Sequence, residues 1–269
     1  MPELPEMENY RILLSGRITG RTITGTEVDR EKSINVTPER FREELLGASV
    51  RLIERRAKHL LFHLSTGNLL VLHLMIGGIL YYGRLEDRPD RTVQVRISFG
   101  DEHLFFIGLR LGYLHLHSPE EASELMKKLG PDPFDPALTE EAFANRLRTR
   151  KGTLKSNLVD QSVLAGIGNC YSDEICYIAG LLPARRPATL SAEEYGKLHS
   201  AMREVLTEAT RYGGYMEMPL YRGDALTGGF DARCRVYDAE GKPCQRCGQP
   251  IVRQEVSSKK SFCCVHCQH

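Results

Sequence analysis

The chain has 269 residues, of which 41% are hydrophobic and 26% are charged, and its formal net charge is +1. This length suffices for two compact domains, and the composition excludes a disordered, collagen-like or coiled-coil protein. The apolar runs are too short for a transmembrane helix, and the acidic start MPELPEMENY is unlike a signal peptide. We therefore expect a cytoplasmic protein with no membrane partner. A near-zero net charge neither indicates nor excludes a nucleic-acid partner.

Residues 1–130 are predicted to form a mainly antiparallel β domain with two helices. Apolar residues recur at helical spacing over residues 3–14, and residues 38–47 show a similar pattern. Two alternating apolar runs flank Ser-Thr-Gly-Asn at 65–68, and two more flank Gly-Asp-Glu at 100–102. Both patterns are typical of β-hairpins.

A proline-rich break follows this β-rich part. The segment GPDPFDP at 130–136 contains three prolines, so we place the domain boundary there and assign residues 131–233 to a helical domain. A Thr cap signal begins one predicted helix at residue 139, and a long amphipathic helix ends at Gly213-Gly214. Residues 213–233 contain five glycines and show no period, which predicts a flexible surface loop.

The cysteines gather in the last domain, residues 234–269. Five of the eight lie within the last 26 residues, and four form two Cys-x2-Cys pairs sixteen residues apart. These four are Cys244, Cys247, Cys264 and Cys267. Their spacing is typical of a four-thiolate zinc site, which is structural because no coordination position stays open. We expect one structural Zn²⁺ per chain, with Cys263, His266 and His269 as competing ligands, and an unligated hairpin as the alternative.

The N-terminus carries a candidate nucleophile. Proline is a small residue, so we expect Met1 to be removed, which would expose the secondary amine of Pro2. An α-amino group has a pKa near 7.7–8.0, so part of it is unprotonated at neutral pH. Attack of this amine on a sugar C1′ gives an iminium that promotes β-elimination, with Glu3 as a candidate general acid or base. Taken alone, a Met-Pro start more often marks an inert N-terminus.

Four segments together resemble the formamidopyrimidine-DNA glycosylase / endonuclease VIII family of base-excision enzymes. The start PELPE is that family's signature, and ERRAKHLLFHL carries its Arg-Arg-x-Lys-x-Leu pattern, with the lysine at Lys58. LVDQSVLAGIGNCYSDEICYIAGLLP is similar to its helix–two-turns–helix element, and PCQRCGQPI with SFCCVHCQ is similar to its zinc finger. The resemblance implies an α+β fold: an N-terminal β-sandwich with flanking helices, a helix–two-turns–helix domain and a zinc-finger β-hairpin.

The resemblance also implies an activity: a bifunctional DNA glycosylase and abasic-site lyase acting on damaged, oxidised bases in double-stranded DNA. Such a protein is a bacterial, nucleoid-associated monomer that needs no cofactor for its chemistry. The lesion nucleotide is flipped out, Pro2 attacks its C1′, and β- and δ-elimination cut the strand. Glu3 and Lys58 assist proton transfer and electrostatic stabilisation. Further family positions near the lesion and the phosphates are Glu6, His73, Lys155, Asn169, Tyr237 and Lys259.

Three of these positions can also be interpreted from the residues themselves. In Gly-Ile-Gly-Asn at 166–169, the glycines permit close backbone approach, and Asn169 at a helix start can hold a phosphate together with Lys155. An ordinary helix–helix turn is the alternative for this motif. His73 lies in an apolar strand, where a satisfied core histidine is the alternative to a DNA contact.

Purine-specific members of the family insert three side chains into the gap that the flipped base leaves. At these three positions the sequence differs from those members. Ile76 replaces a methionine, Leu109 an arginine and Leu111 a phenylalanine, and only the second arginine of that loop remains, as Arg110. Apolar side chains can wedge a base stack but cannot donate hydrogen bonds to a base, a contact worth roughly 1–3 kcal/mol. We therefore expect weak preference for the opposite base, or a preference for gaps, abasic sites or bulky lesions.

A second departure concerns the zinc finger, where Lys259 replaces an arginine and keeps its charge but not its bidentate fork. Together the departures favour an alternative hypothesis, a DNA-damage-binding protein of the same fold that does not excise bases. An unrelated zinc-ribbon protein would require the PELPE start to be accidental.

Overall fold

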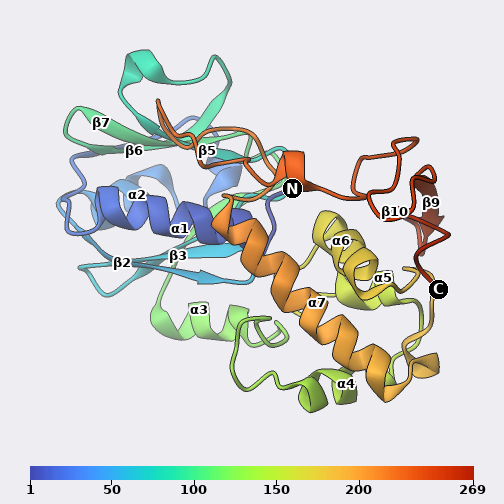
Figure 1. The fold of residues 1–269 in the computed structure, drawn as a ribbon. Helices are drawn as coiled ribbons and strands as arrows, with labels where there is room; N and C mark the ends of the chain where they lie inside the picture. Colours follow the sequence, from blue (N-terminus) through green and yellow to red (C-terminus); the bar gives the residue numbers. More distant parts are fainter. The chain divides into compact units, whose positions relative to one another are not determined.

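The computed structural model describes residues 1–269, which divide into two units (Figure 1). The first unit comprises residues 1–128 and 216–229, and the second comprises residues 129–215 and 230–269. None of the helices is long and apolar enough to cross a membrane.

The first unit is a β-sandwich with flanking helices, as the sequence predicts. Its elements are α1 (Leu4–Ile18), β1 (Gly25–Val28), α2 (Pro38–Leu45), β2 (Val50–Arg56), β3 (His59–Leu64), β4 (Leu69–His73), β5 (Ile79–Gly83), β6 (Val93–Phe99), β7 (Glu102–Ile107), β8 (Tyr113–His117) and α3 (Pro119–Met126). The strand order is β1-β6-β7-β5 in one sheet and β2-β3-β4-β8 in the other, and all pairs are antiparallel. The two predicted hairpins are β3–β4 and β6–β7.

The sandwich core lies between the inner faces of the two sheets. Alternating residues of the strands point inward, as the apolar alternation requires. One sheet contributes Leu60, Leu72 and Leu114, the other contributes Leu80, Val95 and Phe106, and α1 adds Met7, Tyr10 and Leu14. The core therefore fixes both the sheets and the helix that begins at the N-terminus.

Two loops of this unit, β4–β5 and β7–β8, approach each other backbone to backbone. A Cβ atom on Gly108 would lie 2.3 Å from the carbonyl oxygen of Gly77, and Gly108 also has a positive φ of 70°. A Cβ atom on Gly112 would lie 2.4 Å from the carbonyl oxygen of His73. Only glycine permits these contacts, so the two loops support each other in one conformation.

The second unit is helical and carries a two-stranded hairpin. Its elements are α4 (Glu140–Arg148), α5 (Leu154–Leu158), α6 (Asn169–Ala179), α7 (Ala192–Arg211), β9 (Val252–Val256) and β10 (Lys259–Cys263). The hydroxyl of Thr139 accepts a hydrogen bond at the start of α4, and Ser191 forms a capping box at the start of α7. These caps satisfy backbone N–H groups that have no partner within the helix, which explains why α4 begins where the sequence predicts.

The segment 216–229 differs from the expected surface loop. Its backbone is irregular, but Leu220 is fully buried in the sandwich core, and its carbonyl oxygen accepts a hydrogen bond from the N–H of Tyr82 at 2.6 Å. The carboxylate of Asp224 accepts from the N–H of Leu220 at 2.9 Å and from the hydroxyl of Thr227 at 2.6 Å. A single buried leucine among glycines has no period, so the sequence pattern does not reveal this anchor.

Leu220→Ala should release this segment from the sandwich. Removing a buried leucine side chain costs about 3 kcal/mol. We expect faster tryptic cleavage after Arg222 and a lower urea midpoint. Leu226→Ala is the matched control, because Leu226 belongs to the same segment but is 40% exposed. Equal cleavage rates in the two variants would show that Leu220 does not anchor the segment.

Candidate functional site

The N-terminal motif PELPE builds the start of α1. Pro5 occupies the first turn, where a missing N–H costs no hydrogen bond. The carboxylate of Glu6 accepts from the backbone N–H of Glu3 at 2.8 Å. Pro2, Glu3 and Glu6 are all buried. The motif therefore fixes Pro2 at the start of a rigid helix, next to buried carboxylates.

Lys58 lies in the turn between β2 and β3 and is only 5% exposed. Burial penalises the ammonium and lowers the pKa of Lys58, while the carboxylates of Glu3 and Glu6 act in the opposite direction. These carboxylates thus stabilise a cation that would otherwise be costly to bury. The structure brings together Glu3, Glu6 and Lys58, with Pro2 next to Glu3 in the chain. Such a group can hold and transfer a proton beside the N-terminus.

His73 lies at the end of β4, in a row of rings on the outer face of its sheet. Its ring centroid is 4.3 Å from that of His59 and 5.7 Å from that of Tyr113. The Nε2 atom of His59 lies 3.2 Å from the hydroxyl of Tyr113. Burial, with the nearby His59 and Lys58, lowers the pKa of His73 to about 3, so its imidazole is neutral at physiological pH. His73 is half-buried and stacked rather than enclosed in the core.

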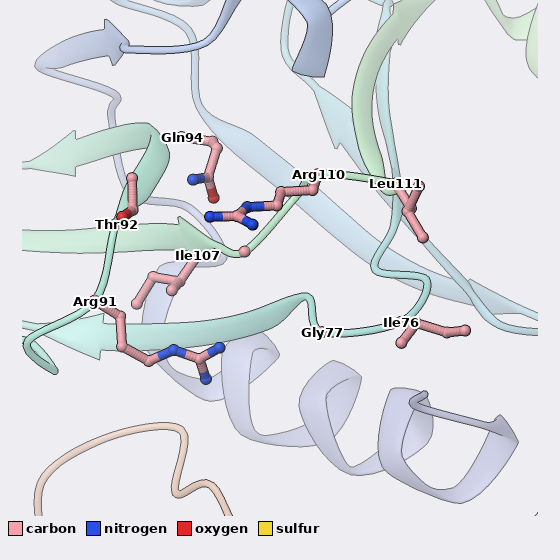
Figure 2. A pocket seen from close by; sticks show the side chains of 9 residues that line it. Ile76, Gly77, Arg91, Thr92, Gln94, Ile107, Arg110 and Leu111 are labelled. Atoms are coloured by element: carbon pink, nitrogen blue, oxygen red, sulfur yellow. The ribbon is translucent and has the colours of Figure 1, made fainter.

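The three residues at the predicted gap-filling positions do not form one surface. Ile76 and Leu111 are 67% and 63% exposed, whereas Leu109 is fully buried in the sandwich core. The backbone N–H of Leu109 donates to Oε1 of Gln94 at 2.9 Å. The side chain of Leu109 therefore anchors the β7–β8 loop to the core instead of projecting from it. Of the three apolar residues expected to fill the gap, only Ile76 and Leu111 are exposed. Arg110, the next residue, is exposed and lines a pocket (Figure 2).

The Gly-Ile-Gly-Asn turn joins two helices of the second unit, α5 and α6. Gln161 holds it closed: its Nε2 donates to the carbonyls of Val159 and Ile167, and its Oε1 accepts from the N–H of Gly166 at 2.8 Å. Gly166 has a positive φ of 102°, which favours glycine. The turn leaves Asn169 exposed at the first position of α6. Asn169 is therefore placed where a helix start can receive an anion.

Lys155 does not have the exposed position that a phosphate ligand needs. It is fully buried, and its ammonium lies 2.8 Å from the Oδ1 atom of Asp173 and 2.8 Å from the carbonyl oxygen of Asn169. The expected phosphate contact of Lys155 is therefore replaced by a buried ion pair. Because Asp173 lies eighteen residues further along the chain, the local sequence pattern does not predict this ion pair. Lys155 acts as a positioning residue for the start of α6.

Two neighbouring carboxylates of α6 hold the C-terminal segment, and sequence reasoning missed both. Asp173 also accepts from the hydroxyl of Ser261 at 2.6 Å and from the N–H of Phe262 at 3.1 Å. Glu174 is fully buried and accepts the backbone N–H groups of residues 235, 236 and 237 at 2.8–3.0 Å. The signal that could have revealed them is the pair of adjacent acidic residues in a largely apolar stretch of the helix. Buried carboxylates require hydrogen-bond partners, so such a pair predicts contacts with another segment.

The four predicted cysteines converge at the C-terminus. All four sulfur atoms lie within 4.8 Å of one another, with Cys244 and Cys267 3.9 Å apart and Cys247 and Cys264 3.5 Å apart. A tetrahedral zinc with sulfurs at about 2.3 Å requires sulfur separations of about 3.8 Å, so the cluster fits. Cys263, His266 and His269 do not belong to the cluster. The structure thus has a four-cysteine group that fits a metal ion.

The two remaining predicted residues flank this cluster. Lys259 begins β10 after a turn at Ser257 and Ser258, both of which have positive φ. The hydroxyl of Ser257 lies 3.0 Å from that of Thr153, which caps α5. The ring of Tyr237 meets that of Phe262 edge-on, with centroids 5.5 Å apart. The hairpin that carries Lys259 is therefore tied to the same helices that present Asn169.

Asp173→Asn should be strongly destabilising, because it leaves the Lys155 ammonium buried without its countercharge. We expect a loss of about 3–5 kcal/mol in the free energy of unfolding, measured in urea. The double variant Lys155→Met/Asp173→Leu should recover only part of this loss, since it removes both charges but leaves the Ser261 hydroxyl and the Phe262 N–H without their acceptor. Asp231→Asn, at an exposed aspartate of the same unit, is the control. A loss no larger than the control's would contradict the role given to the pair.

Comparisons with known proteins cover the whole chain. The family model described as "Formamidopyrimidine-DNA glycosylase N-terminal domain" matches residues 1–113, and "Formamidopyrimidine-DNA glycosylase H2TH domain" matches residues 129–218. The formamidopyrimidine-DNA glycosylase of Pelotomaculum thermopropionicum is 35% identical, with 100% of this chain and 99% of the relative covered. That of Geobacillus kaustophilus is also 35% identical, with full coverage of both.

Solved structures agree with these matches. A complex between a Lactococcus lactis FPG mutant and a Fapy-dG containing DNA is similar with a TM-score of 0.92 and 30% identity over 100% of both chains. A complex between Lactococcus lactis Fpg and an abasic site containing DNA is similar with a TM-score of 0.92 and 29% identity over 99% of both chains.

Proposed function

The chain belongs to the formamidopyrimidine-DNA glycosylase family, and we propose that it excises a damaged base from DNA and cuts the strand at the abasic site that remains. The observation that carries this proposal is the buried group formed by Glu3, Glu6 and Lys58 next to Pro2. A protein that only bound damaged DNA would gain nothing from burying a lysine beside two carboxylates. Relatives of known structure bind Fapy-dG and abasic-site DNA, which supports oxidised purines and abasic sites as substrates.

The chemistry begins when Met1 is removed and Pro2 presents a secondary amine. The amine nitrogen forms a bond to C1′ of the flipped-out nucleotide, and the bond between C1′ and the base breaks as the base leaves with a proton. Opening of the sugar ring leaves an iminium at C1′. A buried acid such as Glu3 can supply and accept the protons that these steps exchange.

The iminium then acidifies the C2′ hydrogen. Loss of that proton expels the 3′ phosphate, and a second elimination expels the 5′ phosphate, so the strand is cut on both sides of the lesion. The Lys58 ammonium stabilises negative charge that develops on the leaving oxygen atoms. Each elimination regenerates a conjugated cation, which is why an amine catalyst serves both steps.

We propose that four further residues, one exposed and three half-buried, hold the DNA backbone. Asn169 offers an amide at a helix start, and Lys259 offers a charge on the zinc-finger hairpin. His73 offers the single N–H donor of a neutral imidazole, and Tyr237 lies in the segment that Glu174 fixes. All these residues belong to one chain, which supports action as a monomer.

Trapping with borohydride tests the catalytic proposal. Borohydride reduces the iminium to a stable amine, so the wild type should form a covalent adduct with a duplex that contains one abasic site. Pro2→Gly keeps a primary amine and should trap much more weakly. Lys58→Met should lower strand cleavage by about 100-fold or more, as expected for a group that acts in proton transfer.

The control for this experiment is duplex binding by each variant, measured with an uncleavable abasic analogue. If the wild type binds the duplex but gives no adduct, the chain is a damage-binding protein and not a lyase. Adduct formation that Pro2→Gly leaves unchanged would show that the secondary amine has no special role, because this variant keeps a primary N-terminal amine.

We further propose that the four-cysteine group binds one structural Zn²⁺. The four thiolates fill its coordination sphere, so the ion holds the hairpin in place and takes no part in the reaction. The hairpin has little core of its own, so its fold depends on the metal.

Metal removal should therefore weaken DNA binding. We expect one zinc per chain by elemental analysis of the purified protein, and a loss of at least tenfold in duplex affinity after chelation, because the hairpin carries Lys259. Added Zn²⁺ should restore the affinity. Unchanged affinity of a metal-free protein would contradict a structural role for the ion.

A further inference from the structure

Three rings lie side by side across the β2-β3-β4-β8 sheet, on its outer face. His73 of β4 is the middle one, because in the strand register it pairs with His59 of β3 on one side and with Tyr113 of β8 on the other. Side chains at such paired positions contact each other directly. The proposed function gives His73 a contact with the DNA backbone, but it gives no role to His59 or Tyr113.

The two flanking rings enclose His73. Its ring centroid lies 4.3 Å from that of His59 at an interplanar angle of 31°, and 5.7 Å from that of Tyr113 at 69°, edge to face. The Nε2 atom of His59 and the hydroxyl of Tyr113 are 3.2 Å apart and share a hydrogen bond. Because this bond joins the two flanking side chains, neither can turn away from His73 without losing it.

Tyr113 is itself held from the far side. Its ring stacks on that of His115, with centroids 4.2 Å apart and an interplanar angle of 25°. Together with Leu125 and Met126 of α3, Tyr113 also packs against the buried apolar cluster of this face. The position of Tyr113 is therefore fixed by both β8 and α3, so that its ring forms a rigid wall beside His73.

The charged groups that face these rings come from the β2–β3 turn. The Lys58 ammonium acts on both histidines, and Arg56 acts on His59. On the other sides, β8 contributes the uncharged phenol of Tyr113, and α3 contributes apolar side chains. An imidazolium at His73 would thus have cations as its neighbours. Burial lowers the pKa of His59 to about 4, so this ring is neutral at physiological pH like that of His73.

We propose that His59 and Tyr113 are positioning residues for His73: they enclose its ring and fix its orientation, so that it meets a backbone phosphate as a neutral hydrogen-bond donor. The inference rests on the proposed function, which assigns that phosphate contact to His73. The neutral form suits the site, because an imidazolium would place a second positive charge near the Lys58 ammonium. A neutral donor contacts the phosphate without changing the charge of the catalytic group.

The first test is an NMR titration of the histidine side chains without DNA, in which His73→Ala identifies the His73 signal. In the wild type this signal should not titrate between about pH 5 and pH 8. Tyr113→Ala and His59→Ala each expose the imidazole to water, so the pKa of His73 should rise above about 5, toward the ordinary value of histidine. Tyr113→Phe keeps the ring and should restore the behaviour of the wild type.

The second test measures affinity for a duplex with an uncleavable abasic analogue, with and without His73→Ala. In the wild-type background this substitution should cost about tenfold in affinity, as for one hydrogen bond to a charged group, and equally at about pH 6 and pH 8. In the Tyr113→Ala background the factor should be larger at the lower pH, because the exposed imidazole is then partly protonated. His63→Ala is the matched control, since its ring lies beside Glu54 on the same strand as His59.

Two results would overturn the proposal. One is a His73 signal that stays untitrated in both Tyr113→Ala and His59→Ala, and the other is a wild-type factor that is absent or that grows toward low pH. Rings with a merely structural role would lower stability without changing either pH dependence. Neither test requires catalysis, so both remain valid if borohydride trapping fails. Trapping that succeeds while these tests fail would overturn the positioning role and leave the proposed excision and strand cleavage intact.

Discussion

A charge buried inside a protein must have a partner, and this constraint holds the functional parts of the chain in place. Burying an isolated ion costs several kcal/mol, so each buried acid or base fixes the groups that compensate it. Lys155 and Asp173 show this directly, because their ion pair joins α5 to α6 and Asp173 also accepts hydrogen bonds from Ser261 and Phe262 of β10. Lys58 shows the same principle in the first unit, where its partners are the carboxylates of α1.

These buried charges differ in their consequences. The Lys155–Asp173 pair is structural: it determines where Asn169 and the β9–β10 hairpin lie. Lys58 is paired less completely, because burial still lowers its pKa in spite of Glu3 and Glu6. A lysine kept in an unfavourable site at some cost to stability is typical of a functional group. The difference between the two lysines therefore supports a positioning role for Lys155 and the proposed catalytic role for Lys58.

Much of the fold could be predicted from local patterns. Strand alternation revealed both hairpins, a threonine cap signal revealed the start of α4, and the Cys-x2-Cys spacing revealed the four-cysteine cluster. These features succeed because each depends on residues close together in the chain.

The rest depended on contacts between distant residues. The sequence alone predicts Lys155 as a phosphate ligand, because it does not show that Asp173 lies next to this lysine. It likewise predicts Leu109 as a gap-filling residue, because it does not show that this side chain lies in the core. Leu220 is buried by strands that lie more than a hundred residues earlier. That Arg110 and Gln94 line the same pocket likewise appears only when β6 and the β7–β8 loop are placed together.

The central claim is that the amine of Pro2 is the nucleophile. Mass spectrometry of the borohydride-trapped adduct after tryptic digestion tests it most directly. The account predicts that the sugar remnant is attached to the N-terminal peptide, residues 2–11, which contains no lysine. Attachment to a peptide that contains a lysine, above all Lys58, would contradict this assignment, because the neutral amine of that lysine would then be the nucleophile.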